Sequence, residues 1–162
     1  MKRYLAADFG AGSGRVIVGT LTQTLTLTQT IELEEIHRFG NEQKMIDGHL
    51  RWDFEALFNE LKTGLKKAFA KYGDEIESIG VDTWGVDYGL LDEDGKLIST
   101  PICYRDNRTK GMLELAFQKL PKEEFFQHAA NQFMEINTAF QLLNETDLQR
   151  AERLLFMPDL FN

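Results

Sequence analysis

The segment "YLAADFGAGSGRVIVGTL", residues 4–21, restricts the fold more than any other stretch of this chain. It joins an apolar run to a β-branched run through three glycines that lie two residues apart. Both runs predict strands, because short apolar and β-branched segments bounded by glycine favour a sheet. We therefore expect a strand, a tight turn and an antiparallel strand, with Gly10, Gly12 and Gly14 able to adopt positive φ.

A glycine turn of this kind can bind phosphate, and the known phosphate loops offer a comparison. A P-loop needs a Lys-Ser/Thr pair after its last glycine, whereas Arg15 and Val16 follow here. The dinucleotide fingerprint opens a helix, but strand-like residues follow this turn. A hairpin whose N–H groups surround an anion remains, with Ser13 and Arg15 beside it. The residues equally allow a plain glycine-rich hairpin in which Asp8 caps its own turn.

Asp8 ends the first predicted strand, directly before the glycines. A carboxylate there repels phosphate unless Mg²⁺ or its waters lie between them. Asp8 therefore fits a phosphate site only as a metal residue. The three histidines, His37, His49 and His128, show no metal-ligand spacing.

The rest of the chain predicts a mixed sheet with helices packed against it. Segment 24–36 alternates and predicts a half-solvated antiparallel strand, with Leu25, Leu27, Ile31 and Leu33 on one face. Asp53 is the expected N-cap of a helix that ends at Gly73. Its apolar stripe is Phe54, Leu57, Phe58, Leu61, Leu65 and Phe69. The following predicted elements are a buried strand at 77–84, a hairpin turning at Asp94–Gly95, helices near 109–120, 121–130 and 138–145, and a helical turn at 147–153.

Composition excludes several classes of protein. The 162 residues suffice for one core, and a net charge of −8 without a basic cluster argues against binding to nucleic acid or anionic membranes. Cys103 is the single cysteine, so no internal disulfide forms and a reducing compartment is expected. The start of the chain has no signal-peptide pattern, and no run of 18 apolar residues occurs. We expect a soluble cytoplasmic protein.

The C-terminal segment "LLFMPDLFN" predicts a helix starting at Pro158 that stops after one turn, at Asn162. Such a short apolar helix should not bury its face, so we expect an exposed patch at Leu160 and Phe161. The interpretation is that the chain is a fragment of a longer protein. The alternative is a natural C-terminus with a frayed tail.

Two motifs, "DTWGVD" and "YRDNRT" within residues 78–109, together with the opening "DFGAGSGRV", resemble the FGGY carbohydrate kinases. "EIHRFGNE", "DGHLRWDFEALF", "ANQFMEINTAFQLL" and "LLFMPDLF" continue the resemblance in order, over nearly the whole chain. In detail it is similar to the members that phosphorylate L-rhamnulose. The resemblance implies an α/β, actin-like or ribonuclease H-like mixed sheet with flanking helices. Residues 1–162 would then be the N-terminal part of a sugar kinase's first domain, with the second domain absent.

The resemblance also implies roles for individual residues. The parent enzyme would transfer the γ-phosphate of ATP to O1 of L-rhamnulose, with Mg²⁺ held through water by Asp8. Asp82, Trp84 and Gly85 would bind the sugar. The family's catalytic base, an aspartate in a His-Asp pair, has no match before Asn162, so this chain alone is expected to be inactive and its parent a monomer. The expected ATP-phosphate contacts are Ala11, Gly12, Ser13, Gly14 and Arg15, and the weaker sugar-pocket candidates are Gln132, Phe133 and Asn137.

Other interpretations remain open for the whole chain. The sugar could be another ketose or polyol, such as L-fuculose or xylulose. The chain could be a stand-alone, non-catalytic binding module. An actin-like ATPase without a sugar would give "DTWGVD" no role.

Structural roles also remain open for single residues. Trp84 could belong to the core, and Asp82 and Asp87 could satisfy turn amides. Asn137 could be a helix cap. The triplet Arg105, Asp106 and Arg108 is expected to hold its loop through ion pairs rather than to touch substrate.

Overall fold

The computed structural model describes residues 2–23 and 29–162, which fold into two compact units. Each unit is assembled from separate stretches of the chain. The sheet unit comprises Met1–Glu42, Asp53–Trp84 and Met157–Asn162, and the helical unit comprises Gln43–Trp52 and Gly85–Phe156.

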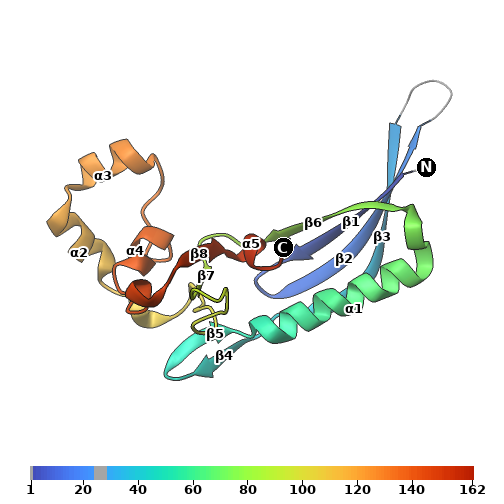
Figure 1. Cartoon of the computed structure of the whole chain (residues 1–162). Coiled ribbons are helices and arrows are strands. Elements are labelled where there is room, and N and C mark those ends of the chain that lie inside the picture. The colour runs from blue at the N-terminus through green and yellow to red at the C-terminus, as the bar shows by residue number, and fades with distance from the viewer. Residues whose placement is uncertain (1, 24–28) are drawn as a thin grey trace. The chain divides into compact units, whose positions relative to one another are not determined.

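A four-stranded mixed sheet forms the sheet unit, in the order β3-β2-β1-β6 (Figure 1). β1 pairs antiparallel with β2, β2 pairs antiparallel with β3, and β1 pairs in parallel with β6. This arrangement confirms the predicted mixed sheet. Leu25 and Leu27 lie outside the described residues. The strand bounds are β1 Lys2–Phe9, β2 Ser13–Gln23, β3 Gln29–Gly40 and β6 Ile76–Thr83.

Helix α1, Phe54–Tyr72, lies along one face of this sheet (Figure 1). Asp53 caps it by accepting a hydrogen bond from the Ala56 N–H at 3.1 Å, and Gly73 ends it at a φ of 52°, so both predicted limits are confirmed. The helix approaches the sheet closely, because a Cβ at Gly64 would lie 2.3 Å from Val16. The buried face of α1 is Leu57, Leu61, Gly64 and Ala68, whereas Phe58 and Phe69 of the predicted stripe are exposed.

The core of the sheet unit lies between α1 and the sheet face that carries Leu5, Ala7, Phe9, Val16 and Val18. On β3, Glu34 contacts α1 through Lys71 and Tyr72, so its neighbour Leu33 faces the other way. Ile31 and Leu33 are 66% and 72% exposed. The alternation in this strand is confirmed, but its apolar side is solvated, because α1 covers the opposite face.

Strand β6 is predicted from the sequence to be buried, and this part of the prediction is wrong. The strand exists at the expected place, but it is the edge strand of the sheet. Ile79 at its centre is 44% exposed.

The C-terminal turn α5, Met157–Leu160, packs into the core of the sheet unit. Met157 is fully buried and Phe161 is 6% exposed, so the predicted apolar patch at Leu160 and Phe161 is wrong. The ring of Phe161 stacks on Phe9 at 4.3 Å and lies 4.9 Å from the ring of Phe54. One helical turn buries its apolar groups here because the aromatic ring at its end fits between the sheet and the start of α1.

In the helical unit, strand β7 pairs with β8, and β4 pairs with β5 through a turn at Asp47–Gly48 in which both residues have positive φ. The predicted turn at Asp94–Gly95 is confirmed, since the Asp92 N–H donates to the Lys96 carbonyl at 2.9 Å. The predicted hairpin is borne out only next to this turn, where Leu97 bridges to Leu91 and the Ile98 N–H donates to the Leu90 carbonyl at 2.9 Å; the strand that pairs along β7 is β8. The bounds are β4 Gln43–Ile46, β5 His49–Trp52, β7 Tyr88–Leu91 and β8 Arg153–Phe156.

Short helices follow these strands in the helical unit and confirm the predicted series. They enclose an aromatic cluster of Phe117, Phe125, Phe133 and Phe140, whose rings meet mainly edge to face. In the described part of the chain, no helix combines the length and the hydropathy that are needed to cross a bilayer. The helices are α2 Met112–Lys119, α3 Lys122–Ala129 and α4 Thr138–Leu142, with 3₁₀ turns at Asn107–Thr109 and Leu148–Arg150.

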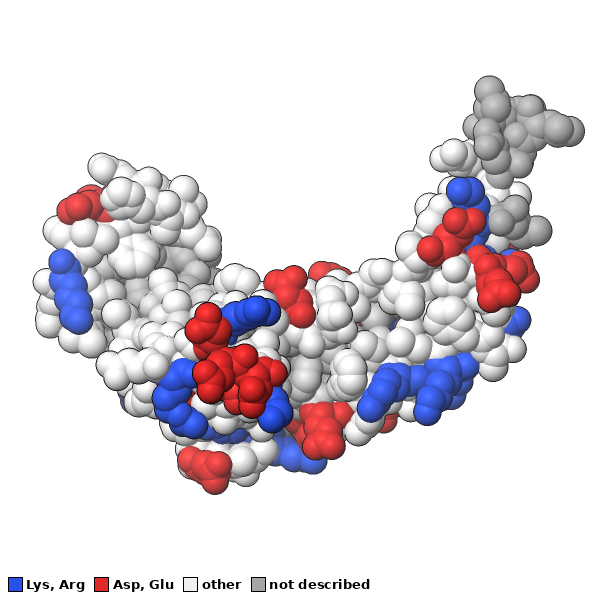
Figure 2. All heavy atoms as spheres, in the orientation of Figure 1, with Lys and Arg blue, Asp and Glu red and all other residues white. Residues whose placement is uncertain are grey.

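Acidic and basic side chains are interspersed on the face that Figure 2 shows. Several of them pair at the surface of the sheet unit, such as Arg38 with Glu35 and Lys71 with Glu34. Hydrogen bonds from Lys71 and Tyr72 lower the pKa of Glu34, and one from Arg38 lowers the pKa of Glu35. These exposed pairs add little to stability.

Candidate functional site

The glycine turn between β1 and β2 is closed by its own backbone and held by a residue that follows β3. The Gly10 N–H donates to the Ser13 carbonyl at 2.9 Å. Asn41 donates from its side-chain amide to the Gly10 carbonyl at 2.9 Å and from its backbone N–H to the Gly12 carbonyl at 3.1 Å. Asn41 is 3% exposed. Sequence reasoning gave it no role, although it stands in the motif "EIHRFGNE" that carries part of the resemblance.

The glycines of this turn do not adopt the positive φ that the sequence predicts. Gly14 is required by packing instead, since a Cβ there would lie 2.2 Å from the ring of Phe39. A Cβ at Gly10 would lie 3.0 Å from the Ser13 carbonyl oxygen. Around Gly12, no described atom lies within 4 Å of where a Cβ would be. The turn therefore leaves open space at Gly12, where a ligand has room to approach the backbone.

Three charged residues on β1, β2 and β6 lie in one row beside this turn, and Arg38 on β3 continues the row opposite Arg15. Asp8 on β1 is opposite Arg15 on β2 and beside Asp82 on β6. The Arg15 guanidinium donates to the Asp8 carboxylate, and their side chains are 41% and 36% exposed. Phe9, next to Asp8, points into the α1 core, so the row lies on the opposite face of the sheet. The structure thus brings together the predicted metal residue, a predicted phosphate residue and a predicted sugar residue.

This row is compatible with Mg²⁺. The ion keeps several waters and is usually bound through one or two carboxylates plus substrate phosphates. Asp8 and Asp82 offer two neighbouring carboxylates, and Asp8 is accessible to solvent. Within residues 2–23 and 29–162, no three His, Cys, Asp or Glu side chains gather as a metal site. A magnesium ion here would therefore depend on water and phosphate for its other ligands.

Trp84 ends the sheet unit and Gly85 begins the helical unit. Trp84 is partly buried and packs against the core of the sheet unit, in agreement with its structural interpretation. At Gly85, no described atom lies within 4 Å of the place that a Cβ would take, and φ is outside the left-handed region. Neither packing nor conformation of the described residues requires glycine there, which leaves room for a ligand against the backbone.

Val86 adopts a conformation that β-branched residues rarely take, with φ at 68°. The Asp87 N–H donates to the Gly85 carbonyl at 2.9 Å and closes a tight turn around it. Thr138 and Gln141 hold the turn from α4, donating to the Val86 carbonyl at 2.8 Å and 3.2 Å. Such strain costs about 1–3 kcal/mol and is characteristic of binding and active sites. No residue pattern around Val86 indicates this strained turn in advance.

Asp87 is fully buried and has a structural role. Its carboxylate accepts hydrogen bonds from the Trp52 indole at 2.6 Å, the Tyr104 N–H at 3.1 Å and the Gln141 amide at 3.0 Å. The structural interpretation of Asp87 thus holds, but its donors come from distant segments and are not the turn amides that the sequence suggested.

Asp106 and Arg108 hold their loop, as expected. Asp106 accepts hydrogen bonds from the backbone N–H groups of Leu50 at 2.6 Å and Arg108 at 2.9 Å. Arg108 forms a buried ion pair with Glu145 at 2.8 Å. Burial raises the pKa of both carboxyl groups, but hydrogen bonds from Leu50, His49 and Arg108 to Asp106, and from Arg108 and Tyr88 to Glu145, outweigh it and leave both pKa values lowered.

The weaker sugar-pocket candidates come together around a pocket of about 260 Å³ in the helical unit. Asn137 stands at the N-cap position of α4, yet its side chain makes no cap bond and instead accepts from the Met134 N–H at 2.8 Å. The pocket joins an aromatic wall to amide and hydroxyl groups, which suits a hydroxylated ligand with one apolar side. The lining includes Val86, Phe125, Gln132, Phe133, Asn137 and Thr138.

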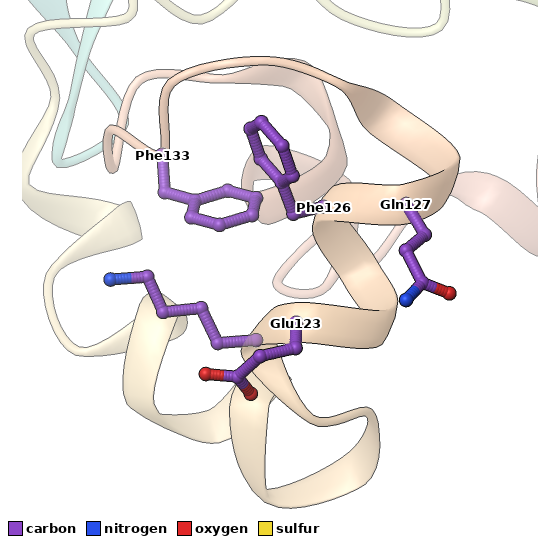
Figure 3. Close-up of a pocket in the computed structure, with 5 residues that line it drawn as sticks. Glu123, Phe126, Gln127 and Phe133 are labelled. Carbon is purple, nitrogen blue, oxygen red and sulfur yellow. The ribbon is translucent and has the colours of Figure 1, made fainter.

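A second pocket, of about 400 Å³, lies beside α3 (Figure 3). Its walls are the rings of Phe126 and Phe133, 6.2 Å apart, with Lys122, Glu123 and Gln127 beside them. In this view Gln127 points away from the Phe133 ring (Figure 3). The residues predicted for sugar binding, Phe133 excepted, do not line it.

Comparison with known proteins identifies the family. A model of the N-terminal domain of the FGGY family of carbohydrate kinases matches residues 3–157. The rhamnulokinase of Pectobacterium atrosepticum is 42% identical over the whole of this chain, which covers 33% of that protein. The rhamnulokinase of Lactiplantibacillus plantarum is 39% identical over 98% of the chain, which covers 32% of that protein. The chain thus spans about a third of the length of these relatives.

Solved structures show the same fold at low sequence identity. A gluconate kinase from Lactobacillus acidophilus superposes with a TM-score of 0.73 at 14% identity, over 95% of this chain and 31% of its own. A ligand-bound xylulose kinase from the same organism gives a TM-score of 0.72 at 13% identity, over 95% and 31%. The sequence match and the shared fold agree: this chain belongs to the FGGY family of carbohydrate kinases, and its residues 3–157 match the family's N-terminal domain.

Proposed function

We propose that the protein to which this chain belongs is an ATP-dependent sugar kinase that phosphorylates L-rhamnulose at O1, giving L-rhamnulose 1-phosphate. Two rhamnulokinases about 40% identical over nearly the whole chain support this substrate. The observation that carries the proposal is the row Arg15, Asp8 and Asp82 beside the glycine turn. Phosphoryl transfer depends on charge neutralisation and positioning, and this row combines a cation, two carboxylates and an open turn.

Each part of the row has a role in the proposal. The turn from Ala11 to Arg15 approaches the ATP phosphates, with space at Gly12 and a positive charge from Arg15. Asp8 holds Mg²⁺ through water, and the bound ion would supply positive charge to the transferring phosphate. The ion pair between Asp8 and Arg15 is exposed, so it can exchange partners when phosphate and metal enter.

The sugar is bound by Asp82 near the end of β6 and by the residues that directly follow this strand. Asp82 accepts hydrogen bonds from sugar hydroxyls, and Gly85 lets its backbone approach the ring. Trp84 presents the part of its indole that the core leaves uncovered. The weaker sugar-pocket candidates, Gln132, Phe133 and Asn137, line the 260 Å³ pocket of the helical unit.

The catalytic base is proposed to lie outside this chain, beyond Asn162. Residues 1–162 would then be the N-terminal part of the enzyme's first domain. In this proposal the chain alone does not turn over, and the complete enzyme is a cytoplasmic monomer that uses ATP and Mg²⁺.

A sugar panel tests the substrate. The product of the gene, read past Asn162, is incubated with MgATP and L-rhamnulose, L-fuculose, xylulose or gluconate, and ADP release is followed. The proposal expects the highest kcat/KM with L-rhamnulose and a ¹³C shift at C1 of the product. A higher kcat/KM with another sugar would retain the kinase and reject this substrate.

A further inference from the structure

Gln141 on α4 is a buried amide that joins three separate segments of the helical unit. It is 1% exposed. Its side-chain N–H groups lie 3.2 Å from the Val86 carbonyl, 3.0 Å from the Asp87 carboxylate and 2.9 Å from the Ile136 carbonyl. Its carbonyl oxygen accepts from Arg108 at 2.9 Å.

The site requires an amide at this position. Acceptors surround the nitrogen and a guanidinium faces the oxygen, and glutamine provides donors at one end and an acceptor at the other. A glutamate would place a negative charge beside Asp87, which is also buried. A shorter or apolar side chain would leave the Arg108 guanidinium and the Ile136 carbonyl without this partner.

The Val86 turn needs such an external restraint. At a φ of 68° a valine is strained, and extended backbone would be lower in energy. The Gln141 amide contacts both the carbonyl of Val86 and the carboxylate of Asp87, the next residue along the chain. Thr138, one turn earlier on α4, adds a hydrogen bond of 2.8 Å to the same carbonyl. The strained turn is thereby fixed in one orientation.

We infer that Gln141 is a positioning residue for the sugar: it holds the strained Val86 turn, and through it the Gly85 backbone and the wall of the 260 Å³ pocket, in the orientation that binds substrate. This inference rests on the proposed function, because Gly85 is a sugar residue only in that proposal. It predicts that loosening the turn weakens sugar binding and leaves ATP binding unchanged.

The test compares three variants of the complete enzyme. Gln141→Met keeps length and removes every hydrogen bond from this side chain to the turn. Thr138→Val removes only the bond from the hydroxyl to Val86. Glu145→Gln is the matched control, because it perturbs the same buried Arg108 without touching the turn. KM for sugar, KM for ATP, kcat and the thermal unfolding midpoint are measured for each.

The expected result is a sugar KM about tenfold higher for Gln141→Met and about threefold higher for Thr138→Val, with ATP KM unchanged. Glu145→Gln should change sugar KM less than about twofold. Equal sugar KM values in Gln141→Met and Glu145→Gln would overturn this inference and leave the proposed function standing. Absence of sugar-dependent turnover in the unmodified enzyme would overturn the proposed function and the inference with it. Where Gln141→Met does not fold, an unchanged sugar KM in Thr138→Val overturns the inference.

Discussion

At the scale of single residues, two glycines of one turn are present for different reasons. Gly14 faces the Phe39 ring and has no room for a side chain, whereas Gly12 faces open space. The sequence shows both as members of the same repeat. Substitution by alanine should separate the packing role from the ligand role.

Gly14→Ala should destabilise the chain by about 1–3 kcal/mol, because the Phe39 ring must move out of the core. Gly12→Ala should change stability by less than about 0.5 kcal/mol and raise the ATP KM of the complete enzyme. Thermal unfolding of the two variants, run side by side, measures the first effect, and initial rates measure the second. Equal unfolding midpoints would contradict the packing role of Gly14.

Cys103 should be chemically inert in the folded protein. It is 1% exposed, and burial raises the pKa of its thiol to about 11. The thiolate is the reactive form and is scarce at mildly alkaline pH. Ellman's reagent should therefore label native protein slowly and unfolded protein at once. Rapid labelling of the native chain would contradict this assignment.

At the scale of elements, the sequence predicted correctly those features that depend on residues close together in the chain. The limits of α1 followed from Asp53 and Gly73, because caps and helix ends are set by neighbouring residues. The partner of β7 could not be predicted, since β8 lies more than sixty residues away and both strands have only four residues. The hairpin of β4 and β5 was missed although Asp47–Gly48 is a strong turn signal.

Burial was harder to predict than element type. The apolar residues Ile31 and Leu33 alternate correctly but face away from α1, and alternation alone does not say which face is covered. Phe161 was expected to be exposed and is buried, because its contacts with Phe9 and Phe54 come from distant parts of the chain.

Asn41 should control the shape of the glycine turn from its place after β3. Asn41→Ala removes the hydrogen bond to the Gly10 carbonyl and leaves this half-buried acceptor with one partner fewer. We expect the ATP KM of the complete enzyme to rise several-fold, on the order of 1 kcal/mol of binding energy, with the sugar KM unchanged. An unchanged ATP KM in a folded Asn41→Ala variant would show that the turn needs no support from this residue.

Asp106 should make the chain's stability depend on pH. Its pKa is lowered in the folded state, so its contribution is present above the unfolded value of 3.8 and is lost as pH falls through the folded value. Asp106→Asn should cost about 1–3 kcal/mol at neutral pH, because the half-buried N–H groups of Leu50 and Arg108 lose a charged acceptor.

The comparison of wild type with Asp106→Asn should be made by urea unfolding over a range of pH. The difference between the two proteins should shrink below the ordinary aspartate value. A difference that stays constant down to strongly acidic pH would show that the charge of Asp106 is not responsible.

At the scale of the whole molecule, part of the candidate site could be predicted from the sequence. Asp8, Arg15 and Asp82 stand in motifs, and strand pairing brings them into one row. Asn41, Gln141 and the strain at Val86 could not be predicted, because each involves segments about thirty or more residues apart in sequence. Motifs indicate which residues meet a ligand, whereas the residues that hold them in place emerge only from the fold.

The central claim is that this chain belongs to a sugar kinase and is not a binding module of the same fold. Sugar-dependent ATP turnover distinguishes the two. ADP release from MgATP is measured with and without L-rhamnulose, using the product of the gene read past Asn162, its Asp8→Ala variant and the 162-residue chain. We expect turnover that needs the sugar, at least about a hundredfold loss in a folded Asp8→Ala variant, and none for the chain alone. Turnover that ignores the sugar, or survives Asp8→Ala, would contradict the kinase assignment of these residues.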